Sequence, residues 1–280
     1  MQFIEKRKWF YIFSLIIIIP GIISMFMQGF NLGIDFKGGT MLRYRIETPA
    51  EVAAITKAVN DLQVASEVSV QQSGNEFYIR SNELNQEQTE QITAALSSQF
   101  GTVTLLSAES VGATIGSELV RNAFMAVAIA LVLMLIYITF RFEWSFGLAA
   151  VLALFHDVLI VCGIFSLFQL EVNGAFIAAI LTIIGYSIND TIVIFDRVRE
   201  NLRMKKKEAL ESLLNKSIMQ TMNRSVNTVL TVLMPLIALL MFGGATIKVF
   251  VITLLIGFIF GMYSSICIAS PFYYEIKQRG

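Results

Sequence analysis

The stretch Ala175-Phe-Ile-Ala-Ala-Ile-Leu-Thr-Ile-Ile-Gly-Tyr-Ser-Ile-Asn-Asp-Thr-Ile-Val-Ile-Phe195 decides the class of this chain. It is long and apolar enough to cross a bilayer, because about 20 apolar residues span the hydrocarbon core. It also contains one acid, Asp190. An ionisable side chain at that depth costs at least about 2.5–3.5 kcal/mol on insertion scales. Asp190 is therefore a candidate functional residue, and the strongly basic segment after it suggests a proton or ion path.

Composition agrees with an integral membrane protein that carries one sizeable polar insertion. The 280 residues are 55% hydrophobic and only 15% charged, whereas soluble domains carry about 25% charged residues. Cys162 and Cys267 both lie in apolar segments, so they predict no disulfide framework. A single histidine, His156, is too few for a multi-histidine metal cluster. We therefore expect neither a metal site nor a cofactor.

Six segments are long and apolar enough to be transmembrane helices. We place them at 9–28, 119–140, 145–168, 174–195, 224–242 and 249–270. The first follows three basic residues as a signal peptide would. Its apolar core is too long, however, and no small-x-small cleavage site follows, so we expect a retained helix. In the sixth span, Gly257-x-x-x-Gly261 predicts close helix packing.

The distribution of Lys and Arg predicts how these spans are oriented. Basic residues gather on one side: before the first span, in the segment 197–223 and after the last span. The short loops of the other side hold only Lys248. We expect both termini in the cytoplasm, with 197–223 as a basic cytoplasmic loop. Residues 1–28 then form the N-terminus and first span, 29–118 an external (periplasmic) domain, and 119–280 the other five spans.

The external segment alternates strand and helix patterns. We expect strands at 40–46, 66–72, 76–81 and 102–107, with helices at 49–62 and 85–100. Thr48 before Pro49 is typical of one helix start, and Asn85 of the other. The order β-α-β-β-α-β is that of the ferredoxin-like motif. Five basic against eleven acidic residues make this α+β domain a poor nucleic-acid binder. It either contacts something outside the membrane or serves as a rigid spacer.

Polar residues lie at membrane depth in three spans. The fourth span carries a set at spacings of three and four, hence on one helix face: Thr182, Tyr186, Asn189 and Asp190. The fifth span repeats this spacing with Arg224, Thr228 and Thr231. The third span has His156 and Asp157 near its midpoint.

Asp190 and Arg224 are the charge pair to test. Asp190 lies about 8 Å from the centre of its span, toward the cytoplasm, at 1.5 Å per residue. Arg224 lies at the cytoplasmic mouth of the fifth span, so the two side chains meet if these helices are neighbours. An arginine favours a charged carboxylate whereas burial opposes it, and this competition is what a proton relay needs.

Each of these residues also has a plainer interpretation. Asp190 can belong to a fixed structural ion pair, and Arg224 can extend its head group to the interface as one more cytoplasmic cation. His156 and Asp157 can pair with each other or hydrogen-bond neighbouring helices. For His156 we favour this packing role, and for Asp157 both roles stay open.

Three motifs carry a family resemblance. Leu32-Gly-Ile-Asp-Phe-Lys-Gly-Gly39 follows the first span, and Phe155-His-Asp-Val158 lies in the third. The longest motif begins within the fourth span and continues past its end: Gly185-Tyr-Ser-Ile-Asn-Asp-Thr-Ile-Val-Ile-Phe-Asp-Arg-Val-Arg-Glu-Asn201. With six spans and a large first external loop, the chain resembles the SecF family, the smaller membrane subunits of the SecDF export factor. The first motif is shared with SecD, whereas the Ser-Ile-Asn-Asp-Thr form favours SecF.

The resemblance implies a partner and an activity. A SecF subunit pairs with SecD in a pseudo-symmetric bundle related to the RND exporters, of which this chain would be one six-span half. That assembly associates with the SecYEG channel and uses the proton gradient to pull unfolded protein out across the bacterial cytoplasmic membrane. In the family, acids and arginines at the positions of Asp190 and Arg224 are associated with proton transport. The supporting polar face would then comprise Asn189, Tyr186, Thr182, Thr228, Asp157 and His156.

No nucleotide-binding loop or hydrolytic set of residues is visible, so we expect a membrane-driven transport subunit and not an enzyme. We hypothesise that protonation of Asp190 weakens its attraction to Arg224, repacks the fourth and fifth spans and rocks the external domain. One alternative is half of an RND-type small-molecule or lipid exporter, which should line its external domain with an aromatic-rich pocket. Another is a scaffold that stabilises other Sec subunits and tolerates apolar residues at both positions.

Overall fold

The computed structural model describes residues 2–204 and 208–279. The chain divides into two compact units, which we treat separately. The helical unit comprises Met1–Asn31, Met125–Gly243 and Ile247–Gly280, and the α/β unit comprises Leu32–Phe124 with Gly244–Thr246.

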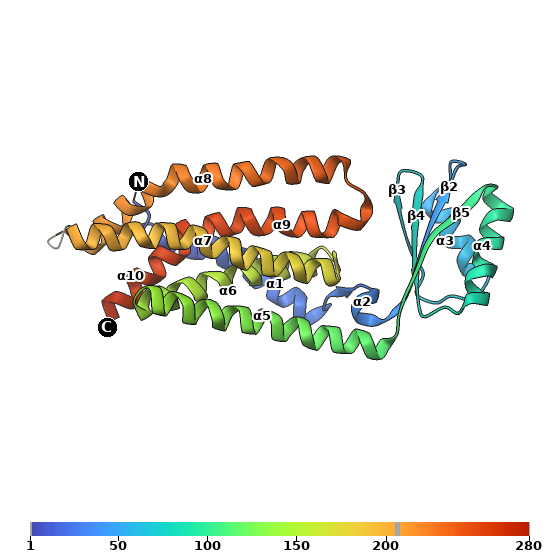
Figure 1. The fold of residues 1–280 in the computed structure, drawn as a ribbon, viewed down its shortest axis with the longest axis horizontal. Helices are drawn as coiled ribbons and strands as arrows, with labels where there is room; N and C mark the ends of the chain where they lie inside the picture. Colours follow the sequence, from blue (N-terminus) through green and yellow to red (C-terminus); the bar gives the residue numbers. More distant parts are fainter. Residues whose placement is uncertain (1, 205–207, 280) are drawn as a thin grey trace. The chain divides into compact units, whose positions relative to one another are not determined.

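Long apolar helices make up the helical unit and run lengthwise beside each other (Figure 1). They are α1 (Arg7–Met27), α5 (Ala113–Arg141, which begins in the other unit), α6 (Trp144–Leu167), α7 (Gly174–Met204), α8 (Leu210–Phe242) and α9 (Ala245–Ser264). A π-helical turn, Ser265–Ala269, continues α9 into α10 (Ser270–Arg279). Among the described residues six helices are long and apolar enough to cross a membrane, counting α9 to α10 as one. Each of the six predicted spans corresponds to one of these candidate helices.

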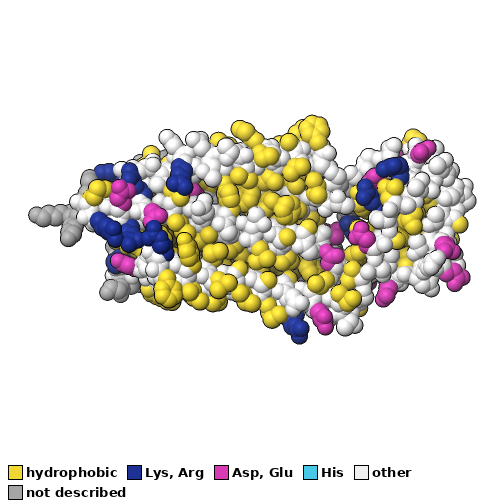
Figure 2. All heavy atoms as spheres, in the orientation of Figure 1, with side chains coloured by type: hydrophobic (Ala, Val, Ile, Leu, Met, Phe, Trp, Pro, Cys, Tyr) yellow, Lys and Arg dark blue, Asp and Glu magenta, His cyan; other side chains and the backbone are white. Residues whose placement is uncertain are grey.

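Burial separates the inner helices from the outer ones. In α6 56% of the apolar window is buried inside the unit, whereas in α5 only 6% is. Figure 2 shows hydrophobic side chains over the middle of this unit's visible face, with charged side chains gathered toward one end. This surface suits a hydrocarbon environment, because water would disfavour so much exposed apolar area.

Small residues set the closest helix crossings. Gly21 of α1 faces Gly163 of α6 so closely that a Cβ added to Gly21 would lie 2.6 Å from the Gly163 Cα. On α9, Gly257 packs against Ile183 of α7, and Gly261 packs against Ser187 one turn further along α7. The close packing predicted from the Gly257-x-x-x-Gly261 pattern is therefore confirmed, and its partner is α7.

The α/β unit places two helices beside a four-stranded antiparallel sheet with the strand order β3-β4-β2-β5. Its elements are α2 (Ile34–Lys37), β2 (Gly39–Ile46), α3 (Val52–Asp61), β3 (Ser69–Ser73), β4 (Glu76–Ser81), α4 (Gln86–Phe100) and β5 (Val103–Val111). The chain also has two short strands outside this sheet, β1 (Asn31–Leu32) and β6 (Glu171–Val172). Alternate residues of β2 and β4 point to one side, where they meet the helices. The resulting core is Leu42, Tyr44, Ile46, Ile55, Ala58, Val59, Phe77, Ile79, Leu84, Ile92 and Leu96.

Gly38, in the Gly-Gly pair that ends the first motif, packs against the start of α5. A Cβ on Gly38 would lie 2.9 Å from the Cα of Ala113, and one on Gly116 would lie 2.7 Å from the Phe36 carbonyl oxygen. Gly38 has a φ of +79° and Gly39 a φ of +129°, which L side chains rarely adopt. These glycines let the backbone before β2 contact the first turn of α5, which follows β5 after only Gly112.

Several predicted boundaries are wrong. The helix expected at 49–62 begins at Val52, because Glu51 is its extended N-cap and Thr48 instead donates to the carbonyl of Phe100. The strand expected at 66–72 is β3 at Ser69–Ser73, and the strand expected at 102–107 extends to Val111. Asn85 is the predicted N-cap of α4, in a capping box with Gln88.

The predicted basic loop 197–223 is also wrong for most of its length. Residues 197–204 continue α7, and 210–223 are the first turns of α8. Both helices extend beyond the apolar spans because polar residues also form good helices where water satisfies their side chains. Lys205, Lys206 and Lys207, the most basic part of that segment, lie outside the described residues.

Candidate functional site

Asp190 lies on the buried face of α7, with 7% of its surface exposed. Its Oδ1 atom accepts a 2.6 Å hydrogen bond from the hydroxyl of Ser225 on α8. Its Oδ2 atom is buried and has no hydrogen-bond partner within the described part of the chain. A buried polar atom without a partner is costly and rare in folded proteins. This carboxylate is therefore only half satisfied within the described part of the chain.

The prediction that Asp190 contacts Arg224 is wrong. Asp190 instead contacts Ser225, the next residue along α8. Ser225 is fully buried, whereas the side chain of Arg224 is exposed on the surface of α8. Within the described ranges, no ion pair of 4.0 Å or less joins Asp190 to Arg224. Consecutive helix residues point about 100° apart, so both cannot face α7. Arg224 still attracts the Asp190 carboxylate electrostatically from nearby.

Helices α7 and α8 are neighbours at this depth, as the sequence argument required. Besides the Ser225–Asp190 bond, the Tyr186 hydroxyl on α7 donates a 2.9 Å hydrogen bond to the backbone carbonyl of Thr228 on α8. The Thr228 hydroxyl itself donates to the carbonyl of Arg224, within its own helix. At this depth these two interhelical hydrogen bonds lie about one helical turn apart. Further along the same seam, Arg197 and Asn201 of α7 hydrogen-bond to Ser217 and Gln220 of α8.

Two residues of the predicted polar face do not join this seam. The Thr182 hydroxyl donates to the carbonyl of Ala178 in its own helix, and its side chain is exposed. Asn189 is exposed as well. The shared face that the spacing predicted is therefore only partly buried against α8, with Asp190 buried and Tyr186 half-buried.

Asp157 of α6 is the second buried acid, and its oxygens are fully used. Its Oδ1 atom lies 3.0 Å from Nδ1 of His156. Its Oδ2 atom accepts hydrogen bonds of 2.7 Å from Ser187 on α7 and 2.8 Å from Ser264 on α9. Only 1% of the Asp157 surface is exposed. This carboxylate joins three helices at one point.

The other side of His156 extends the network to α1. Its Nε2 atom lies 2.8 Å from the Ser14 hydroxyl, which in turn lies 3.2 Å from the hydroxyl of Tyr263 on α9. Tyr263 donates to the backbone carbonyl of Phe10 on α1. A continuous polar path thus crosses from α1 through α6 to α7 and α9.

Sequence spacing did not single out the hydroxyl residues of these networks. Ser187 and Ser264 contact Asp157, Ser225 contacts Asp190, and Ser14 and Tyr263 extend the network beyond His156. All five lie in apolar segments and carry no charge. A signal was present, since hydroxyl side chains inside membrane spans often hydrogen-bond across helices. The partners of each hydroxyl depend on which helices are adjacent, however, and sequence spacing does not give that.

Among the described residues, no three His, Cys, Asp or Glu side chains are grouped so that they could hold a metal ion. Cys162 and Cys267 are free thiols. The polar groups that are present can bind, hold and pass protons. They include two buried carboxylates and one imidazole.

Comparison with known proteins identifies the family. A model of the C-terminal region of the protein export membrane proteins SecD/SecF matches residues 91–279, and a model of the SecD/SecF GG motif matches residues 23–50. The chain belongs to the SecD/SecF family. The GG-motif match contains Gly38, whose backbone packs against the start of α5, and Gly39, whose backbone packs against Ser81 of β4.

Relatives of similar length carry the SecF name. The protein translocase subunit SecF of Sebaldella termitidis is 42% identical over 99% of this chain and 92% of its own length. That of Acidaminococcus fermentans is 41% identical over 99% of this chain and 97% of its own length. The protein translocase subunit SecDF of Thermus thermophilus is 39% identical, over 91% of this chain but only 36% of its own length.

Solved structures of SecDF proteins are also similar to this chain. The crystal structure of SecDF from Thermus thermophilus, a translocon-associated membrane protein, matches with a TM-score of 0.92 at 38% identity. It covers 100% of this chain, which spans 39% of the SecDF chain. A SecDF crystal structure in a super-membrane-facing form matches with a TM-score of 0.75 at 37% identity.

Proposed function

We propose that this chain is a SecF-type accessory subunit of the Sec protein translocase, which works with SecD and uses the proton motive force to promote protein export. The names and lengths of its relatives support the translocase role. The match to part of a SecDF chain supports a SecD partner, because there one chain carries both names. SecYEG and the emerging unfolded protein are the further partners of this proposal, and the chemistry is transport and not catalysis.

The partnerless Oδ2 atom of Asp190 is the observation that carries the proton proposal. A proton can be added there without breaking any hydrogen bond, because Oδ1 alone holds the bond from Ser225. Asp157 offers no such position, since both of its oxygens already have partners. We therefore assign proton binding to Asp190. To Asp157 and His156 we assign the role of hydrogen-bonding α6 to the helices around it.

Arg224 is the charge that responds to this proton. Because it lies outside contact distance on the exposed side of α8, it acts on the Asp190 carboxylate through space. Neutralising Asp190 removes that attraction, so at this depth α7 and α8 are joined by the neutral hydrogen bonds at Ser225 and Tyr186. One charge that moves across 100 mV supplies about 2.3 kcal/mol, enough to change a two-state equilibrium roughly fiftyfold.

The α/β unit is the part that meets the exported chain in this proposal. The β-α-β-β-α-β order with the strand order β3-β4-β2-β5 supports a ferredoxin-like domain, inserted between the first and second spans. Basic residues at one end of the spans support an orientation with both termini in the cytoplasm and residues 29–118 outside. The packing of Gly38 and Gly116 at the start of α5 lets a shift of that helix reach β2 directly.

Little of α5 is buried by its own chain, which supports a contact with a second set of spans. Apolar side chains such as Phe124, Ile129 and Leu133 are exposed along it. A SecD half placed there would complete a twelve-helix bundle. Lipid covers whatever apolar surface the partner leaves.

Asp190→Asn tests the proton proposal in membrane vesicles that export a reporter protein. The amide keeps the size of the side chain and its acceptor for Ser225, but it cannot take up a proton at neutral pH. We expect export to lose its dependence on the proton gradient, while the export that occurs without a gradient continues. The control is Asn189→Ala, at the exposed neighbour, which should retain gradient-dependent export.

Full gradient dependence in Asp190→Asn would refute the proton assignment. A scaffold role is tested separately with Asp190→Leu. If this chain only stabilises other Sec subunits, both variants should export normally and co-purify with SecD in mild detergent. Normal co-purification with lost gradient dependence supports the transport role.

A further inference from the structure

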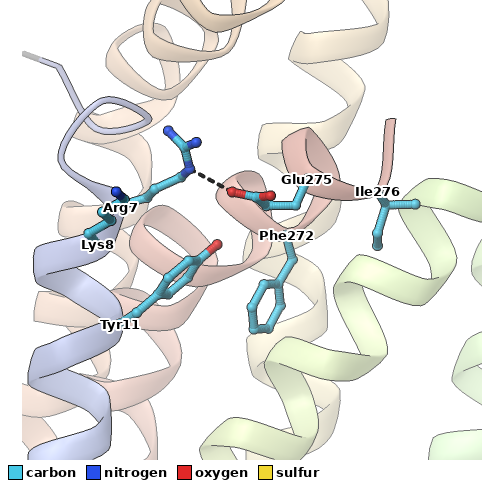
Figure 3. Close-up of a pocket in the computed structure, with 6 residues that line it drawn as sticks. All are labelled: Arg7, Lys8, Tyr11, Phe272, Glu275 and Ile276. Carbon is cyan, nitrogen blue, oxygen red and sulfur yellow. Dashed lines mark hydrogen bonds and ion pairs between the residues drawn. The ribbon is translucent and has the colours of Figure 1, made fainter. Parts of the chain in front are cut away.

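A cavity of about 450 Å³ lies in the helical unit between the first turns of α1 and the outer face of α10. Figure 3 shows the side chains around it, with basic groups on the α1 side and aromatic and acidic groups on the α10 side. Its lining residues are Arg7, Lys8, Tyr11, Phe272, Glu275 and Ile276. The apolar span of α1 begins at Trp9, which is 73% exposed, so the cavity lies where charged and hydrocarbon-facing surfaces meet.

The guanidinium of Arg7 is held in a fixed orientation at this cavity. Its Nε donates a 2.7 Å hydrogen bond to Glu275 and its Nη1 a 2.9 Å hydrogen bond to the carbonyl of Ile4. The Tyr274 ring lies 5.0 Å from the guanidinium carbon. Arginine has five N–H donors in a planar fork, so these two bonds leave others for a ligand. Lys8, the next residue, adds a second, exposed cation.

Tyr11 supplies a second, independent observation. Its hydroxyl oxygen is buried and has no hydrogen-bond partner within the described part of the chain. Figure 3 shows this hydroxyl pointing toward the side of the cavity on which Arg7 and Glu275 lie. The Tyr11 ring stacks on Phe272 with centroids 5.6 Å apart, which fixes its direction. A buried hydroxyl without a partner favours a ligand that can accept its hydrogen bond.

We propose that this cavity binds the phosphate group of an anionic phospholipid. Arg7 and Lys8 provide the positive charge, and the Tyr11 hydroxyl donates to a phosphate oxygen. Basic pockets between transmembrane helices at the membrane surface bind lipid head groups in this way. The apolar side chains of Phe272 and Ile276 face the part of the ligand that leads to the acyl chains.

Glu275 selects among head groups. Its carboxylate repels a second negative charge but can accept a hydrogen bond from a head-group hydroxyl. Phosphatidylglycerol carries one phosphate and two such hydroxyls, so it fits this set of groups. Phosphatidylcholine adds a bulky cation without hydrogen-bond donors, and free inorganic phosphate lacks the chains that would contact Phe272 and Ile276. We therefore expect phosphatidylglycerol to bind most tightly of the three.

The test is thermal unfolding of the full chain in a neutral detergent, titrated with short-chain phosphatidylglycerol, phosphatidylcholine or inorganic phosphate. Phosphatidylglycerol should raise the unfolding temperature in a saturable way, with little effect from the other two. Tyr11→Phe should weaken its apparent affinity about tenfold, since a hydrogen bond to a charged group is lost. Lys8→Gln should weaken it about fivefold, since a lysine near anionic lipid contributes about 1 kcal/mol.

Two controls carry the same chemical change outside the cavity. Lys6→Gln removes one charge from the same end of α1, and Tyr137→Phe removes an exposed tyrosine hydroxyl on α5. Without lipid, Tyr11→Phe should unfold at or above the temperature of the unmodified chain, because its hydroxyl has no partner to lose. Equal stabilisation by phosphatidylcholine, or equal affinity loss in Lys6→Gln and Lys8→Gln, would overturn the proposal. If inorganic phosphate raised the unfolding temperature as much as both phospholipids, the lipid proposal would be wrong and the cavity would be a site for free phosphate.

Discussion

The hydroxyl of Ser225 on α8 donates a 2.6 Å hydrogen bond to Oδ1 of Asp190 on α7, and the other carboxylate oxygen of Asp190 is left buried without a partner among the described residues. This bond connects two helices through residues 35 positions apart in the chain. It fixes the direction in which the acid points and leaves one atom available for a proton. The contact makes Ser225 a positioning residue for the proposed proton site.

Ser225→Ala should destabilise the helical unit. With its only hydrogen bond removed, the buried carboxylate has two unsatisfied oxygens, which costs about 1–3 kcal/mol. We expect a lower unfolding temperature in detergent and a changed pH profile of gradient-driven export. The matched control is Thr228→Ala on the same helix, because the Thr228 hydroxyl bonds only within α8. Equal stability losses in both variants would contradict the assignment.

The two buried acids should respond differently to the same substitution. Asp157→Asn replaces an acceptor oxygen with an amide group that must face Ser187, Ser264 or His156, so at least one of these partners must change from donor to acceptor. We expect destabilisation of about 1–3 kcal/mol. Asp190→Asn can place its amide at the position that has no partner, so its effect on unfolding should be smaller. Thermal unfolding of both variants, side by side, checks this order.

Gly21→Ala and Gly163→Ala should both separate α1 from α6. An added Cβ on either glycine would lie under 3.0 Å from backbone atoms of the other helix, which cannot shift without moving the whole helix. Overpacking of this kind costs about 1–3 kcal/mol. Gly185→Ala is the control, because a Cβ there meets no atom within 4 Å in the middle of α7. Since alanine favours helix over glycine by about 1 kcal/mol, the control should unfold at the same or a higher temperature.

The α/β unit should lose stability in acid through Glu76. Hydrogen bonds from Arg43 lower the pKa of the Glu76 carboxyl below its ordinary value of 4.5, with a smaller contribution from Arg45. The unfolded chain therefore takes up this proton first as the pH falls. The stabilisation is fully present above pH 4.5 and is lost as the pH falls through the lower, folded pKa.

The Glu76 prediction is checked by hydrogen exchange of the β2 and β4 amides in the full chain. Exchange is measured from pH 6 down to pH 3, roughly the span over which a carboxyl titrates. Protection should fall faster on acidification in the unmodified chain than in Glu76→Gln. Arg43→Gln should also weaken the pH dependence, because Arg43 is the main cause of the lowered pKa. Identical acid profiles in all three chains would show that this cluster does not control the stability of the sheet.

Much of the fold follows from local sequence patterns. Runs of apolar residues predict the six spans, and alternation with turn residues predicts the strands and helices of the insertion, because hydrophobic periodicity reflects which face of a segment is buried. The errors lie at element ends. Polar extensions such as 197–204 remain helical without any apolar signal, and Pro49 precedes its helix by three residues instead of opening it.

The sequence by itself determined the membrane class, the family motifs and the choice of Asp190 as a candidate, because an acid in an apolar span is unusual wherever the helix packs. Only the tertiary structure decided that Ser225 and not Arg224 contacts this acid, and that His156 and Asp157 join Ser14, Ser187 and Ser264. The physical reason is that these bonds connect helices far apart in the chain. Which helices touch, and in what rotation, is set by close crossings such as that of Gly21 with Gly163, and a single helix does not encode its neighbour.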